Sequence, residues 1–222
     1  MTAALIQSPN RVVLGNISWQ SYQSLVKDFE ADPRMRLTYV RGTLEILMPL
    51  DPHETYKKLL GRLIEAATEE LELEIRSLGS RTCYREDLAQ GLEPDQCYYI
   101  QNEALVRDVE QIDLTRLPPP DLAVEIDITS SSMNRFAIYA SLGVSEVWRY
   151  DGRSLSIHQL RDGQYIDGDR SAALPVLTAA DVNRFLSLRF PKDETQPALG
   201  ENSLVKQFRL WLRERSTRYE DR

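Results

Sequence analysis

The sequence contains few of the residues from which zinc sites and histidine-dependent active sites are built. Its 222 residues include two cysteines and two histidines. Cys83 and Cys97 lack the repeated C-x-x-C spacing of a zinc site. His53 and His158 lie in no sequence context that is typical of a serine or cysteine nucleophile. We therefore expect reduced thiols, no zinc site and no hydrolysis by serine or cysteine with histidine.

Long hydrophobic runs are also missing. No stretch approaches the roughly 18 apolar residues that are needed to cross a membrane. The N-terminus, MTAALIQSPNRVV, lacks the charged region and apolar core of a signal peptide. Hydrophobic residues make up 42% and charged residues 27% of the chain, as in an ordinary globular protein. We expect a cytoplasmic protein with no membrane partner.

Positive charge is scarce relative to negative charge. The formal net charge is −7. Because phosphate binding needs a concentrated cationic surface, this balance argues against coating by nucleic acid over the whole surface. It leaves room for a local groove that binds nucleic acid.

The length predicts one domain with a helical tail. No segment resembles a flexible linker between two cores. We divide the chain into an N-terminal arm (1–14), a main domain (15–190) and a loop with a helical tail (191–222). One apolar stripe recurs at helical spacing in the tail, formed by Leu204, Val205, Phe208, Trp211 and Leu212. A helix with such a stripe packs on the body of its own chain or on a second copy.

The strongest chemical signal lies within residues 118–151. Residues 121–128 are predicted to form a strand, whose alternation sends aliphatic side chains to one face and Asp121, Glu125 and Asp127 to the other. Three carboxylates on one face repel one another unless a cation lies between them. This face therefore indicates a cation site.

Clear local signals surround this strand. The hydroxyl-rich residues 129–132 favour a turn and a helix start, and Gly143 is placed to end that short helix in a left-handed conformation. A second strand at residues 144–150 runs into Asp151-Gly152, a hairpin signal. The predicted unit is strand, helix, strand and hairpin.

Two further segments bear on the same chemistry. Asp95 follows Pro94 directly, so a proline pins the entry to the strand predicted at residues 96–100. A long amphipathic helix begins near Asp51 and is expected to be the principal helix against the sheet. His53 in its first turn serves a site as a neutral imidazole or, as is commoner, lies on the surface.

Three motifs in order carry a resemblance: EPD at residues 93–95, PPDLAVEIDITSSS at residues 119–132 and IYASLGVSEVWRYD at residues 138–151. With these motifs the chain resembles the Uma-type family of putative restriction endonucleases, part of the PD-(D/E)XK nuclease superfamily. The likeness extends over about residues 15–190. It implies an α/β fold of the mixed α+β type: a restriction-endonuclease-like core with a mixed central β-sheet flanked by helices, an N-terminal hairpin and a C-terminal helix.

The resemblance also implies a metal site and an activity. It assigns Asp95 and Glu125 as carboxylate ligands of a divalent cation, with the backbone carbonyl of Ile126 as a further ligand. Mg²⁺ suits this set because it takes oxygen ligands, commonly one or two carboxylates with waters and a substrate phosphate; Mn²⁺ is an expected substitute. The implied activity is metal-dependent endonuclease hydrolysis of the phosphodiester bonds of DNA.

One position departs from the superfamily pattern. Asp127 stands where the superfamily has a lysine, two residues after the glutamate. Arg135, about one turn into the next helix, is a candidate substitute, although a surface arginine is the alternative; its guanidinium stays protonated and clamps a phosphate rather than acting as a base. Asp127 is a candidate second ligand, about 6–7 Å along the strand from Glu125. Asp121, about 13 Å from Glu125, is expected to cap a turn.

Two functional hypotheses follow. The first is a metal-dependent endonuclease in which Asp95 and Glu125 bind the metal and Asp127 and Arg135 assist. The alternative is a catalytically inactive restriction-endonuclease-like fold that serves as a dimeric binding or interaction module, with the acids as a relic or a structural ion site.

We expect a homodimer, because the tail helix has an apolar stripe and because a nuclease that cuts duplex DNA must approach both strands. Light scattering at micromolar concentration should give the mass of two chains. A monomer mass under these conditions would overturn the expectation.

Overall fold

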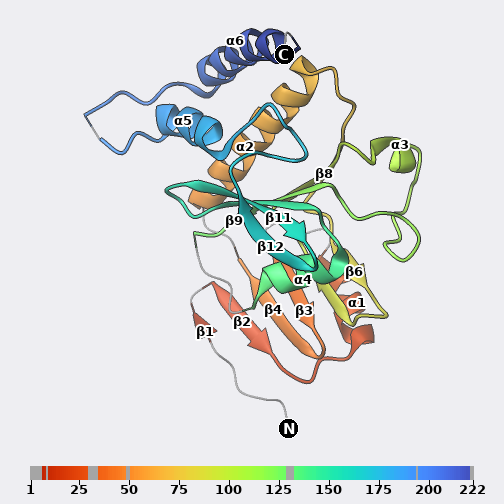
Figure 1. Ribbon diagram of the computed structural model, residues 1–222. Helices are drawn as coiled ribbons and strands as arrows, with labels where there is room; N and C mark the ends of the chain where they lie inside the picture. The colour runs from red at the N-terminus through yellow and green to blue at the C-terminus, as the bar shows by residue number, and fades with distance from the viewer. Residues whose placement is uncertain are drawn as a thin grey trace.

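In this computed structural model the chain forms two six-stranded sheets (Figure 1). The structure describes residues 7–8, 10–29, 35–48, 51–128, 133–193 and 195–220. The turn expected at residues 129–132 lies outside these ranges. The mixed α+β class is confirmed, and the structure has a second sheet beside the expected mixed one.

The sheet that contains the acidic strand is mixed. Its order is β12-β11-β10-β9-β8-β5. The bounds are β5 (Arg76–Gly79), β8 (Gln96–Tyr99), β9 (Leu122–Ile126), β10 (Glu146–Tyr150), β11 (Leu155–Arg161) and β12 (Gln164–Gly168). Strands β9 and β10 are parallel and the other neighbours are antiparallel. The crossover between β9 and β10 carries α4 (Arg135–Leu142), as the predicted strand, helix and strand require.

The other sheet is built around the N-terminal hairpin, which consists of β3 and β4. Its order is β1-β2-β4-β3-β7-β6. The bounds are β1 (Gln7–Ser8), β2 (Arg11–Leu14), β3 (Arg36–Val40), β4 (Thr43–Leu47), β6 (Cys83–Arg85) and β7 (Gln90–Leu92). A hairpin leaves unpaired backbone groups along both edges. Here β2 pairs with β4 and β7 pairs with β3, so that the hairpin becomes the centre of a second sheet.

Helices cover the two faces of the acidic strand's sheet differently. The remaining helices are α1 (Trp19–Phe29), α2 (Asp51–Glu70), α3 (Glu103–Val106), α5 (Ala179–Arg189) and α6 (Glu201–Glu220). The aliphatic face of β9, with Leu122, Val124 and Ile126, joins a large core with α2, α5 and α6. The opposite face looks toward α4, which also contacts β6 and β7 of the second sheet (Figure 1).

The apolar stripe of α6 packs on its own chain. Leu204, Phe208 and Leu212 are fully buried, and α6 lies along α2 and α5 (Figure 1). The ring of Phe208 packs edge to face on the ring of Phe185 in α5, with 5.0 Å between the ring centroids. This contact removes the tail helix as a reason to expect a homodimer.

Local end signals act where the sequence places them. Helix α4 ends at Gly143, whose φ of 82° is left-handed, and the Gly143 N–H bonds back to the helix. Helix α5 begins at Thr178, which forms a reciprocal capping box with Asp181. None of the helices in the described ranges combines the length and the apolar character that spanning a membrane requires.

Replacing Phe208 with Ala should reduce the free energy of unfolding by about 3–5 kcal/mol, because it leaves a cavity between α5 and α6. Urea unfolding followed by circular dichroism measures the loss. Leu210 is 58% exposed on the same helix, so Leu210→Ala should change stability by no more than about 0.5 kcal/mol. Equal losses in both variants would contradict this docking of α6.

Candidate functional site

Antiparallel pairing brings two acidic residues together on one sheet face. The backbone N–H of Asp95 donates to Val124 O at 3.1 Å, and the register of β8 and β9 pairs Gln96 with Val124. Asp95 directly precedes β8, so continuing this register by one residue sets Asp95 opposite Glu125. Directly opposed residues point to the same face, with Cβ atoms about 4.5–5.5 Å apart. The two carboxylates therefore lie side by side.

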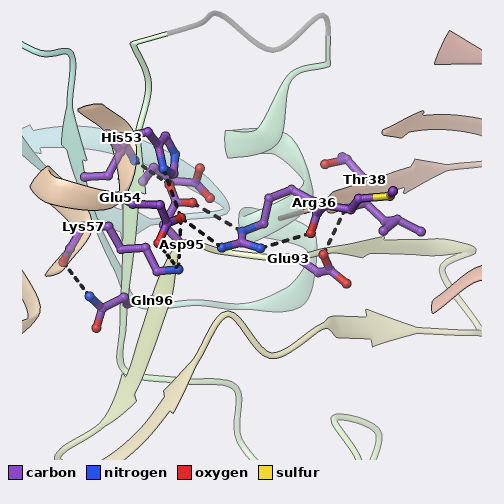
Figure 2. Close-up of polar contacts among 12 residues, drawn as sticks. Arg36, Thr38, His53, Glu54, Lys57, Glu93, Asp95 and Gln96 are labelled. Carbon is purple, nitrogen blue, oxygen red and sulfur yellow. Dashed lines mark hydrogen bonds and ion pairs between the residues drawn. The ribbon is translucent and has the colours of Figure 1, made fainter. Parts of the chain in front are cut away.

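The Asp95 carboxylate is almost fully enclosed by donors and cations. Oδ2 accepts the backbone N–H of Ile126 at 2.7 Å and lies 3.1 Å from Nε2 of His53. Oδ1 lies 3.6 Å from Nε of Arg36, which begins β3 (Figure 2). The side chain is 5% exposed. Contacts from three separate elements thus converge on one carboxylate.

Opposing effects set the charge state of Asp95. Burial on its own raises the pKa of this carboxyl group, but the hydrogen bond and charge of His53, the Ile126 N–H and the Arg135 charge outweigh it. The pKa of Asp95 is therefore below its ordinary value. Asp95 is ionised at neutral pH.

Glu125 has the opposite balance. Its Oε1 accepts Nη2 of Arg135 at 2.6 Å and also the hydroxyl of Tyr139. Burial raises the pKa of Glu125, Arg135 lowers it and the neighbouring Asp95 raises it, so that the pKa stays above its ordinary value. Two adjacent carboxylates with pKa values moved in opposite directions are a common feature of catalytic sites.

Arg135 ties both sheets to this pair. From the first turn of α4 its Nη1 donates to Thr38 Oγ1 at 2.6 Å, and its Nη2 donates to the backbone oxygen of Glu93 at 2.7 Å as well as to Glu125. Burial alone lowers the pKa of Arg135, but the charge of Glu125 reverses this effect and raises it. Arg135 is a fixed and permanent cation.

Asp127 faces the same space but has its own cation. Its Oδ2 accepts Nε and Nη2 of Arg149 at 2.9 and 2.6 Å. The two side chains are 25% and 40% exposed. The acid that replaces the superfamily's lysine is thus held by an arginine of β10.

These residues line one cavity of about 290 Å³. Its polar lining consists of Arg36, His53, Asp95, Glu125, Asp127, Asn134, Arg135, Tyr139 and Arg149, with Ile126 beside them. All the residues that the sequence suggested as metal ligands or catalytic helpers line this cavity. Asp121 does not: its Oδ2 accepts the backbone N–H groups of Ile100 at 2.7 Å and Asn102 at 3.0 Å, the turn-capping role expected of it.

Several contacts were not foreseen in the sequence. Arg36 is remote along the chain, and no local pattern connects it with Asp95. Burial of His53 at 2% exposure was the less common of its two expected placements. Tyr139 had a usable signal, because it follows Arg135 by four residues on a helix and shares its face. Arg149 pairs with Glu125 in the parallel register of β9 and β10, and its contact with Asp127 depends on that register.

The donor set fits a hard divalent cation. Within the described ranges no group of three or more His, Cys, Asp and Glu side chains is arranged to hold a metal ion. Mg²⁺ needs only one or two carboxylates, completed by carbonyl, water and substrate oxygens. Oδ1 of Asp95 and Oε2 of Glu125 accept no hydrogen bond from the described residues, and they are the oxygens that remain for a cation.

Comparison with known proteins identifies a family for the chain. A family model named Uma2 and described as "Putative restriction endonuclease" matches residues 19–184. The chain is also similar to a crystal structure from Anabaena variabilis, described as a putative nuclease belonging to DUF820, with 15% identity, a TM-score of 0.48 and coverage of 72% of this chain and 97% of that chain. No curated protein matches the chain.

Replacing Arg135 with Met should cost about 3–5 kcal/mol, because it leaves Glu125 buried without its cation. Arg135 lowers the pKa of Glu125, so its removal should raise this pKa further above the ordinary value. A carboxyl group with a raised folded-state pKa contributes stability below its unfolded pKa and loses that contribution as the pH rises through the folded pKa. We therefore expect Arg135→Met to lose more free energy of unfolding at about pH 8 than at about pH 5. Urea unfolding in a metal chelator measures it.

Arg149→Met is the matched control for this variant. The Arg149 and Asp127 side chains are partly exposed, so this loss should be only about 0–1 kcal/mol. Similar losses in the two variants, or a loss in Arg135→Met that grows as the pH falls, would contradict the assignment.

Proposed function

The chain belongs to the Uma2 family of putative restriction endonucleases, and from this premise we propose that it is a metal-dependent endonuclease that hydrolyses phosphodiester bonds of DNA. The observation that carries the proposal is that Asp95 is bound to β9 on both sides of Glu125: its N–H donates to Val124 O at 3.1 Å, and its Oδ2 accepts the N–H of Ile126 at 2.7 Å. These two carboxylates share a cavity with the fixed cation Arg135. A phosphodiesterase needs this combination of oxygen ligands for a metal and positive charge for a phosphate.

Each residue has a separate role in the proposed mechanism. Asp95 and Glu125, with the carbonyl oxygen of Ile126, would hold Mg²⁺, or Mn²⁺ in its place. When bound, such an ion polarises a phosphoryl oxygen, lowers the pKa of a water molecule and stabilises the leaving oxygen. Arg135 would replace the absent lysine as the group that stabilises the attacking water or the transition state. Its guanidinium is held by Thr38 and Glu93, and it would stabilise negative charge on the phosphate without accepting a proton.

Asp127 is proposed as a helper whose availability depends on Arg149. In the structure its carboxylate is neutralised by that arginine. An incoming phosphate competes with the carboxylate for the guanidinium, since both are anions that bind arginine in a bidentate manner. Substrate binding would then free Asp127 to face the metal. A homodimer remains part of the proposal only because both strands of a duplex must be reached.

A second candidate is an inactive module that keeps the fold. One observation favours it: each of the three acids already has an arginine partner, Arg36 at Asp95, Arg135 at Glu125 and Arg149 at Asp127. Such pairing satisfies the acids without a metal. In that case the cavity would be a structural ion-pair network and the protein a binding partner.

Cleavage of supercoiled plasmid separates the two candidates. In Mg²⁺ or Mn²⁺ the wild type should nick the plasmid, and the double variant Asp95→Asn, Glu125→Gln should be at least about 100-fold slower, because loss even of the outer partners of metal ligands costs about 10–100-fold. A short single strand tested beside the plasmid shows which form of DNA is cut.

Asp167→Asn serves as the control, since this carboxylate is 90% exposed and lies outside the cavity. It should leave the rate unchanged. No cleavage by correctly folded wild type in either metal would reject the endonuclease and favour the inactive module.

A further inference from the structure

His53 is buried at a position where helix side chains usually meet solvent. It is the third residue of α2, yet it is 2% exposed. Burial of an imidazole beside a carboxylate removes hydration from both groups and is costly unless they bond to each other. His53 makes that bond: its Nε2 lies 3.1 Å from Oδ2 of Asp95 (Figure 2). The ring is therefore held at the site by Asp95 rather than by apolar packing alone.

The contact has a defined direction. An ionised carboxylate can only accept hydrogen bonds, so the proton between the two groups belongs to Nε2 of His53. The other ring nitrogen, Nδ1, lies 3.7 Å from Oε1 of Glu54, beyond hydrogen-bond length. Asp95 thus supplies the hydrogen bond that orients the imidazole, and the imidazole in turn orients Asp95.

Asp95 needs this second donor because its carboxylate plane is otherwise poorly determined. The terminal torsion of an aspartate is broad, with no sharp staggered minima. One N–H, from Ile126, fixes the position of Oδ2 at 2.7 Å but allows rotation about that contact. On the other side Arg36 lies 3.6 Å from Oδ1 and attracts it. Two donors on Oδ2 hold the plane and keep Oδ1 available to a cation.

We propose that His53 is a positioning residue, which fixes the carboxylate of Asp95 so that Oδ1 is presented to the metal. The inference rests on the proposed function for its purpose, but the orientation of Asp95 can be measured without metal or substrate. Outer partners of metal ligands contribute by orienting them, and their loss costs about 10–100-fold in metal affinity. His53 is assigned that role here.

Two substitutions of His53 separate orientation from packing. Gln places a side-chain N–H group near the position of Nε2, whereas Leu fills similar space without a donor. His158→Leu is the control, because this second histidine contacts Ser156 and Asp167 and does not line the cavity. Thermal unfolding establishes that each variant is folded before it is used.

Crystal structures of the metal-free variants give the orientation of Asp95, and calorimetric titration with Mn²⁺ gives the affinity. We expect His53→Leu to turn the carboxylate toward Arg36 or to split it between conformers, and to weaken Mn²⁺ binding about 10–100-fold. His53→Gln and His158→Leu should keep the wild-type orientation and a dissociation constant within about threefold of the wild type.

An unchanged Asp95 carboxylate in His53→Leu overturns the inference, and so does equal Mn²⁺ affinity in this variant and the wild type. A wild type that fails to cut DNA, together with a displaced Asp95 in His53→Leu, rejects the proposed function and supports the positioning role. The two ideas are therefore tested separately.

Discussion

Two largely buried carboxylates, which lie side by side, set the main physical requirement of this structure. A buried acid without a partner is costly, and two such acids repel each other as well. The register of β8 and β9 brings the two acids together, but these strands supply little of the positive charge that the acids need. Arg36 from β3, His53 from α2 and Arg135 from α4 meet it. The site therefore exists only when both sheets and two helices are assembled.

Strand β9 serves stability with one face and chemistry with the other. Leu122, Val124 and Ile126 are buried in the core beneath α2, and Glu125 points to the cavity on the opposite side. Because successive residues alternate between faces, slipping the register by one residue would exchange the two sets. The same hydrogen bonds that hold the core together also place Glu125 beside Asp95. The candidate site is thereby supported by a central strand of the sheet.

The proposed substitution of an arginine for the lysine depends on how the Arg135 side chain is held. Arg135 uses its planar guanidinium to reach Thr38, the Glu93 carbonyl and Glu125 together, which a single ammonium group with a flexible stem does less specifically. Membership of the restriction endonuclease family and this fixed cation together favour phosphate chemistry. The same set of ion pairs also satisfies the acids without metal, which is the feature that favours the inactive module.

Local pattern was enough for much of the fold. Alternation predicted β9 and its acidic face, Gly143 marked a helix end, and ordered motifs indicated the family. The sequence by itself thus determined several of the elements and the candidate acids. Only the tertiary structure decided that the hairpin builds a second sheet, that His53 turns inward and that Arg149 holds Asp127. The reason is that periodicity describes neighbours along the chain, whereas compensation of buried charge depends on residues that meet through strand register and helix packing.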